Sequence, residues 1–300
     1  MKEDSTLSSS SSFAKGLSVL EFFREGRMSA HLEDIVKELG MSRATAYRYL
    51  STLCDAGLLA PIAGGTYVLG PKIIEMDRLI RISDPLLIAG STVMNEVSAH
   101  HNLNMLLASY YRDSVMCIDI AWPDSSVLLE FERGRPMSLF RGAMAKIILA
   151  NLTIYQLRTV ALNHADELRN SGLGPTWPEF RAQMMRIARQ GYALTRAEMI
   201  PNAGGISAPI FSPEQKIVGS ITFVVSADKW QQTDFEKLGV LIQDAAKRTT
   251  ALMVKMAASK TKNVAEGQKK SRSNKARSPA VVKKARSRKL VAAERGRAVK

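Results

Sequence analysis

The sequence has few cysteines and no long apolar run, and each shortage excludes classes of protein. Its 300 residues include two cysteines, Cys54 and Cys117, which are far apart and lack CxxC spacing. They support neither a disulfide framework nor a zinc knuckle, and both are expected to be reduced. No apolar segment approaches the roughly 18 to 20 residues that span a bilayer, and the N-terminus lacks the apolar stretch of a signal peptide. We therefore expect a cytoplasmic protein without a membrane partner.

The signatures of common enzymes are also missing. The chain contains no GxSxG, no P-loop and no GxGxxG motif. His100 and His101 are adjacent, so on a helix their side chains point about 100° apart, and no acid or cysteine lies at ligand spacing. Glu130 and Glu132 would share one face of a strand, but no nucleophile motif accompanies them. We therefore expect no enzymatic activity, no metal site and no cofactor.

The net charge of +14 is unevenly distributed along the chain. Residues 255–300 contain sixteen Lys or Arg and two Glu, which alone gives +14, so residues 1–254 are formally neutral. The pI of 9.9 therefore describes a basic tail rather than a basic domain. Such a tail is a disordered, solubilising end or an electrostatic anchor on DNA, and the two roles are compatible.

Residues 13–54 carry the pattern of a helix-turn-helix. Apolar residues at helical spacing begin at Phe13, and residues 32–39 repeat the i, i+3, i+4, i+7 stripe of an amphipathic helix. Gly40 stands where a helix ends in a left-handed turn, and Ser42 can cap a third helix. A helix, a glycine-containing turn and a second helix form the minimal motif.

The third helix has one apolar and one polar face. The rotation of about 100° per residue assigns each position to a face. The inward stripe consists of Ala46, Leu50, Leu53 and Cys54. The outward residues are Ala44, Thr45, Arg48 and Thr52. Arg43 and Tyr47 flank the outer face near the helix start, where phosphate oxygens can be bound. Residues 58–70 then form two short apolar strands around two glycines, the pattern of a β-hairpin. This hairpin is the expected wing.

The remaining pattern predicts a linker helix and an α+β domain. Residues 72–82 have helical spacing, and Asp84-Pro85 starts another helix to about His100. Strands are expected over residues 104–111, 114–121, 126–132, 192–195, 205–211 and 217–226. Helices are expected over residues 142–150, 154–168, 178–190 and 233–257. This order is typical of an α+β domain with a mixed or antiparallel sheet.

Two groups of segments resemble the IclR family of bacterial transcriptional regulators. The DNA-binding half is represented by AKGLSVLEFF, LEDIVKELGMSRATAYRYLSTLCDAGLL and TYVLG. The segment RPMSLFRGAMAKIILA resembles the family's helix at the edge of its effector pocket, and GYALTRAEMIPNAGGISAPIFSPEQKIVGSITFVVS resembles its closing strands. The resemblance covers about residues 13–256, with both halves in the family's order.

The resemblance implies a domain organisation. It gives a winged helix-turn-helix at residues 13–71, a dimerising linker helix at 72–84 and a PAS- or GAF-like effector domain with a six-stranded sheet at 85–257. The polar residues 1–12 and the basic residues 258–300 are expected to be disordered. Homodimers, often paired into homotetramers, would bind palindromic or repeated operators in double-stranded DNA.

The resemblance also implies site residues. The family's arginine and small-hydroxyl positions in the recognition helix fall on Arg43, Thr45 and Arg48, so the expected DNA-binding residues are Ser42, Arg43, Thr45, Tyr47, Arg48 and Thr52. The expected effector-binding residues are Gly142, Ala143, Met144, Thr195, Gly205, Thr222 and Val224. The family's T-A-x-G-K pattern has lost its threonine hydroxyl here. Because such hydrogen-bonding groups are missing, a larger or more apolar acid, such as an aromatic acid, is the expected effector.

The sequence therefore predicts a transcriptional repressor or activator whose operator affinity is modulated by a small organic acid. A nucleoid-associated architectural protein, whose basic tail dominates its DNA binding, is the alternative.

Overall fold

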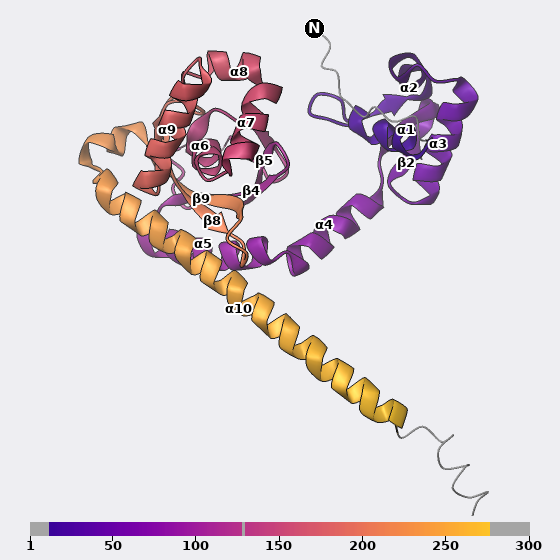
Figure 1. The fold of residues 1–300 in the computed structure, drawn as a ribbon. Helices are drawn as coiled ribbons and strands as arrows, with labels where there is room; N and C mark the ends of the chain where they lie inside the picture. Colours follow the sequence, from indigo (N-terminus) through magenta and orange to yellow (C-terminus); the bar gives the residue numbers. More distant parts are fainter. Residues whose placement is uncertain (1–11, 128–129, 277–300) are drawn as a thin grey trace, which may run out of the picture. The chain divides into compact units, whose positions relative to one another are not determined.

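The structure is a computed structural model that describes residues 12–127 and 130–276, with side chains up to residue 259. The chain divides into two compact units, Met1–Asp84 and Pro85–Lys300. Figure 1 shows the elements of each unit. Of the segments predicted to be disordered, 1–12 and 258–300, residues 1–11 and 277–300 lie outside the described residues, and Ser12 begins a helix.

The first unit is a small helical domain with a three-stranded sheet. Its helices are α1 (Ser12–Ser18), the 3₁₀ helix η1 (Val19–Phe22), α2 (Leu32–Leu39), α3 (Arg43–Asp55) and α4 (Pro71–Ser83). The antiparallel sheet has the order β1-β3-β2, formed by β1 (Ala30–His31), β2 (Leu59–Ile62) and β3 (Thr66–Leu69). Strand β1 is absent from the sequence prediction because two residues are too few to form a periodic pattern.

The core of this unit follows the predicted stripes of α2 and α3, whereas the stripe predicted from Phe13 is wrong at its start, because Phe13 and Leu17 of α1 are exposed. The buried residues are Val19, Phe22, Ala30, Ile35, Ala46, Leu50, Leu53 and Leu59. Gly40 ends α2 with φ +61°, a left-handed conformation that glycine adopts without the steric penalty of a side chain. The turn therefore positions α3 against α2 while its polar face stays exposed.

The second unit is built on a six-stranded antiparallel sheet with the order β6-β5-β4-β9-β8-β7. Its strands are β4 (Asn104–Tyr111), β5 (Ser114–Ala121), β6 (Pro136–Met137), β7 (Ala193–Arg196), β8 (Ala203–Phe211) and β9 (Ile217–Ser226). The helices are α5 (Pro85–His101), α6 (Gly142–Ala150), α7 (Ile154–Asn163), α8 (Ala165–Asn170), α9 (Trp177–Gln190), the 3₁₀ helix η3 (Ala227–Gln232) and α10 (Phe235–Ala276). The sequence predicts a mixed or an antiparallel sheet. All pairings among the described strands of this unit are antiparallel.

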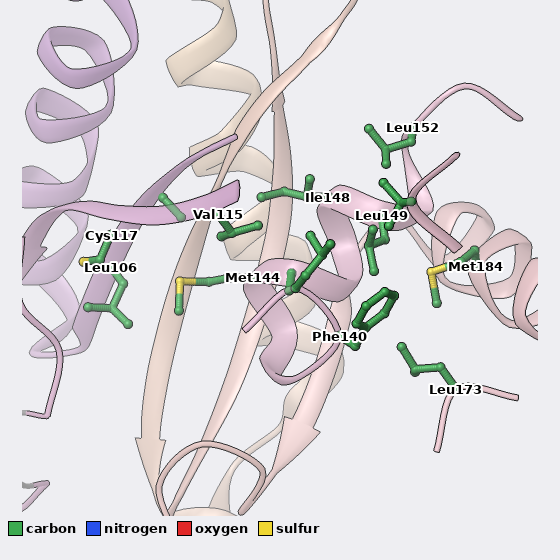
Figure 2. Close-up of a cluster of buried hydrophobic side chains, with 14 of the residues drawn as sticks. Leu106, Val115, Cys117, Phe140, Met144, Ile148, Leu149, Leu152, Leu173 and Met184 are labelled. Carbon is green, nitrogen blue, oxygen red and sulfur yellow. The ribbon is translucent and has the colours of Figure 1, made fainter. Parts of the chain in front are cut away.

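Both faces of the sheet are covered, which explains the nearly continuous apolar run in β4. Because side chains alternate across a strand, Leu106 and Ala108 face one core while Met105 and Leu107 face the other. Helices α5 and α10 cover the second face side by side (Figure 1). On the first face, Figure 2 shows side chains of α6 packed between strand residues on one side and Phe140 on the other.

Three predictions are corrected by the structure. Residues 126–132 do not form a strand where described, because Val127 and Phe131 enter the core as part of an irregular connection, and β6 pairs with β5 instead. The predicted helix over 154–168 is broken at His164 into α7 and α8. Helix α10 continues to Ala276, beyond the predicted tail boundary at 258, since Ala, Lys, Gln and Arg all favour helix.

The two cysteines lie in different units and are not bonded to each other. Cys117 is buried, and burial raises the pKa of its thiol to about 11. None of the described helices combines the length and apolarity needed to cross a bilayer.

Candidate DNA-binding and effector-binding sites

The start of α3 is fixed by local hydrogen bonds among predicted DNA-binding residues. The Ser42 hydroxyl accepts a hydrogen bond from the backbone N–H of Thr45 at 3.2 Å and lies 2.9 Å from the Thr45 hydroxyl. Such a cap stabilises the first turn by about 1 kcal/mol. These hydrogen bonds fix the start of α3. Ser42 is exposed and Thr45 is half-buried, so both hydroxyl groups also reach the surface.

The other four predicted residues are exposed along α3: Arg43, Tyr47, Arg48 and Thr52. The Arg43 guanidinium lies 2.9 Å from Glu33 on α2, but both side chains are more than half exposed. A pair of that kind contributes little to stability, so a phosphate could replace the glutamate. Arg48 lies over the ring of Tyr49 at 5.6 Å. The Thr52 hydroxyl donates to the carbonyl of Arg48 at 2.9 Å, which leaves its oxygen as an acceptor.

The polar face of α3 also contains exposed residues that are absent from the predicted DNA-binding set, among them Ser51 and Asp55. Ser51 is exposed, and the rotation of about 100° per residue places it between Tyr47 and Arg48 on the outer face. The same helical rotation that identified Arg48 also identifies Ser51. Its short hydroxyl side chain is compatible with contact to a base or a phosphate.

The wing is a short hairpin between β2 and β3. Its register pairs Ile62 with Thr66, and three residues connect the strands. Gly64 and Gly65 have φ values of +77° and +70°, so the tight connection requires residues without a side chain. The predicted wing is therefore present as a β-hairpin directly after α3.

In the second unit, all seven predicted effector-binding residues line one cavity. They come from the start of α6 and from three adjacent strands: Gly142, Ala143, Met144, Thr195, Gly205, Thr222 and Val224. The remaining lining residues are Leu106, Phe131, Glu198, Met199, Ile200, Ala203 and Gly204. The wall is thus mainly apolar, with the Thr195 and Thr222 hydroxyls and the Glu198 carboxylate as polar side-chain groups among the described residues.

Strand register explains why distant segments meet at this cavity. Thr195 pairs with Gly205, and Gly205 pairs with Val224, so these residues form a row across β7, β8 and β9. Helix α6 packs on this row. A Cβ atom on Gly205 would lie 3.4 Å from Cβ of Ala143, so two small residues permit the close approach of helix and sheet.

The hydroxyl of Thr222 has a defined direction. It donates to the Ser207 hydroxyl at 2.8 Å, and Ser207 donates in turn to the carbonyl of Ile221 at 3.1 Å. Thr222 therefore presents only acceptor capacity to a bound molecule.

Two residues at the cavity, Glu198 and Met199, were not predicted. The Glu198 carboxylate accepts the backbone N–H of Gly142 at 3.0 Å and pairs with the Lys146 ammonium at 2.5 Å. Met199 packs on Gly142, where a Cβ atom would lie 2.9 Å from its Cγ. No periodic pattern reports them, because they belong to the irregular connection between β7 and β8.

Potential metal ligands do not converge in the described part of the chain. Over that part, no group of three or more His, Cys, Asp or Glu is placed to hold a metal ion. His100 and His101 contact each other edge to face, with ring centroids 4.6 Å apart.

Comparison with known proteins identifies both units. The family profile for the IclR helix-turn-helix domain matches residues 12–61, and the profile for the C-terminal domain of the bacterial transcriptional regulator IclR matches residues 83–251. The chain belongs to the IclR family. This result confirms the predicted family, and this IclR-family chain is a DNA-binding transcriptional regulator.

Individual relatives agree with this assignment. The HTH-type transcriptional regulator KipR of Bacillus subtilis is 25% identical over 234 residues, which cover 77% of this chain and 92% of KipR. The Pca regulon regulatory protein of Pseudomonas putida is 24% identical over 241 residues, 79% of this chain and 81% of that protein.

Solved structures share the fold of this IclR-family regulator, which confirms the predicted fold class. An IclR transcriptional regulator from Alicyclobacillus acidocaldarius aligns with a TM-score of 0.66 and 21% identity, covering 81% of this chain and 98% of the other. An IclR homolog from Microbacterium hydrocarbonoxydans, crystallised with 4-hydroxybenzoate, aligns with a TM-score of 0.63 and 19% identity, covering 81% and 99%.

Proposed function

We propose that this regulator binds a specific operator through α3 and the wing of two copies, and that a small organic acid bound in the cavity beneath α6 changes its operator affinity. The observation that carries the effector half is the convergence of seven predicted residues, from α6 and three strands, on one buried cavity. The exposed face of α3, with Arg48 opposite the buried stripe, supports the operator half.

An aromatic acid suits the chemistry of the cavity. Apolar side chains from both the sheet and α6 form most of its wall, and the relative from Microbacterium hydrocarbonoxydans was crystallised with 4-hydroxybenzoate. Backbone N–H groups in the first turn of a helix have no partner inside that helix and favour an anion. The first turn of α6 begins at Gly142, whose N–H already donates to the Glu198 carboxylate, so this end of α6 is proposed to receive the acid group.

Binding of such an acid requires the cavity to widen. Its volume is about 30 Å³, whereas a single water needs roughly 10–15 Å³ on the same scale. Met144 and Met199 line the cavity, and unbranched methionine side chains change conformation at little cost. The proposed effector therefore binds by displacing side chains rather than by entering an open pocket.

Dimerisation through α4 is part of the proposal. None of its residues is buried within its own unit, and it exposes Ile74, Met76, Leu79, Ile80 and Ile82. A helix that exposes so many large apolar side chains gains stability by packing against a second copy. Two copies would then present two α3 helices to two half-sites.

A DNase I footprint of the full chain at physiological salt tests this proposal. Protection of a discrete site with half-sites about one helical turn apart is expected for the operator-binding function. Uniform, sequence-independent protection would instead support the alternative, a nucleoid-associated protein that binds through its basic tail. Only sequence-specific protection is consistent with the proposed role of α3.

A further inference from the structure

Glu198 is the charged side chain among the described residues that line the cavity. It lies in the connection between β7 and β8 and contacts the start of α6 with both carboxylate oxygens. One oxygen accepts the Gly142 N–H at 3.0 Å, and the other lies 2.5 Å from the Lys146 ammonium. Arg141 also donates to the backbone carbonyl of Glu198, so the connection is attached to α6 by its main chain and its side chain.

Lys146, which pairs with the Glu198 carboxylate, is much less exposed than Glu198 itself. The Lys146 side chain is 12% exposed, whereas that of Glu198 is 31% exposed. A largely buried ammonium group is strongly destabilising without a counter-ion. Glu198 is on the solvent side and can move out, but Lys146 then needs another anion in its place.

The residues around Glu198 close the cavity. Met199 packs on Gly142, and Ile200 is buried with 6% exposure. Ala197 has φ +53°, a left-handed conformation that is strained for a residue with a Cβ atom. Contacts with α6 and the backbone hydrogen bonds of Ala197 and Ile200 with Ala203 therefore hold residues 197–200 in place, against the backbone preference of Ala197.

We propose that Glu198 acts as a carboxylate latch: its side chain occupies the site beside Lys146 that the carboxylate of an acid effector takes when it binds. An incoming carboxylate replaces Glu198 beside Lys146, and residues 197–200 move away with Met199, which widens the cavity. A neutral analogue cannot supply the counter-ion, so the latch selects anions. This inference rests on the proposed function and specifies how that site discriminates among its ligands.

Chemical rescue of the full chain tests the latch without knowledge of the natural effector. Replacing Glu198→Ala removes the atoms of an acetate ion beside Lys146. We expect acetate at about 100 mM to raise the Tm of this variant by about 2 °C or more. Acetamide at equal concentration, with ionic strength held constant by chloride, should not raise it. The wild-type protein should respond to neither compound.

Matched variants make the result interpretable. The double variant Glu198→Ala with Lys146→Met removes both charges and should lose the acetate response. The variant Glu236→Gln, at an exposed position in α10, should behave as wild type. If Glu198→Ala is unfolded in chloride, recovery of its folded state in acetate but not in acetamide is the expected result. The operator test of Glu198→Gln, which keeps the side-chain volume, then tests the latch independently. Equal responses to acetate in wild type and variant, or equal responses to acetate and acetamide, would overturn the latch.

Operator binding separates failure of the latch from failure of the proposed function. An acid that alters operator affinity should act on Glu198→Gln at a concentration at least about tenfold lower than on wild type, because no latch competes with it. If such an acid acts equally on both proteins, the latch is wrong and the effector function stands. If acetate rescues Glu198→Ala while no acid alters operator affinity, the effector function fails and the carboxylate site stands.

Discussion

At the scale of single residues, Arg48 is the side chain of α3 that we propose contacts a base. It is exposed on the face opposite the buried stripe, and its guanidinium lies over Tyr49. Replacing Arg48→Ala should weaken operator binding by about 1–3 kcal/mol, or roughly 5- to 150-fold, with a smaller loss on unrelated DNA. Fluorescence anisotropy with both DNAs at one salt concentration measures the difference.

A matched control for this change is Arg158→Ala, at an exposed position in α7 of the second unit. It removes the same charge far along the sequence from α3 and should leave both affinities nearly unchanged. An equal loss on operator and unrelated DNA for Arg48→Ala would indicate a phosphate contact instead of a base contact. No loss on either DNA would contradict the proposed role of α3.

The two kinds of cavity residue differ in how far sequence could predict them. Thr195, Gly205 and Val224 lie on regular strands, so matching the segments was enough to place them, and strand pairing brings them into one row. Glu198 and Met199 lie in an irregular connection that depends on the left-handed backbone at Ala197. A non-glycine residue in that conformation gives no sequence signal, because it is imposed by tertiary contacts.

At the scale of elements, α4 carries the proposed dimer contact. Leu79 is 47% exposed, and it lies on a stripe with Met76 and Ile80. Replacing Leu79→Glu should leave the fold of the monomer intact, because the position is not buried, but it should prevent two copies from packing there. Sedimentation equilibrium should show a shift from dimer to monomer, accompanied by weaker operator binding.

The variant Arg78→Glu serves as a control, since it places the same glutamate at an exposed position on the same helix outside the stripe. It should retain the oligomeric state of the wild type. If Leu79→Glu also retains that state, the exposed apolar stripe of α4 is not the dimer contact.

The connection after β5 is stabilised by a charge pair that predicts a pH dependence. A hydrogen bond from Lys229, with further ones involving Ser126, lowers the pKa of Asp124 from 3.8 to about 2. A lowered pKa in the folded state stabilises the protein above the ordinary pKa, and this stabilisation disappears as pH falls from about 4 toward 2. The contribution is about 1 kcal/mol, because Lys229 is half exposed and solvent screens the pair.

Urea denaturation of wild type and Asp124→Asn checks this value. The free energy of unfolding should be lower for the variant by about 1 kcal/mol at pH 7. The difference should shrink as the pH is reduced below about 4. The backbone hydrogen bonds of Asp124 with the Asn104 side chain are kept in this variant. A difference that stays constant across that pH range would show that the charge of Asp124 does not stabilise this connection.

Helix α10 shows where composition misleads at this scale. The high density of Lys and Arg after residue 258 predicted disorder, yet the helix continues to Ala276. Charge density and helix propensity are independent properties, and Lys and Arg are good helix formers. Among the residues of α10 whose side chains are described, up to residue 259, the last buried apolar one is Met253.

At the scale of the whole molecule, the basic tail is proposed as a second, sequence-independent contact with DNA. All of the formal net charge lies in residues 255–300. If half of its basic groups neutralise phosphates, they contribute a slope of about −7 to the dependence of log affinity on log salt concentration. Deleting residues 258–300 should weaken binding to every DNA sequence and flatten this slope. An unchanged slope would contradict a DNA-binding role for the tail.

The most direct test of the central claim is the affinity of the full chain for its footprinted operator, measured with and without members of a panel of small aromatic and aliphatic acids. One acid should change the affinity by about 5- to 150-fold, the usual range of coupling between two sites. The variant Gly205→Ala places a Cβ in the cavity 3.4 Å from Cβ of Ala143, an ordinary van der Waals contact, so it should bind the operator normally and respond more weakly to the acid. An unchanged operator affinity with every acid, or an equal response in Gly205→Ala, would contradict control of DNA binding through this cavity.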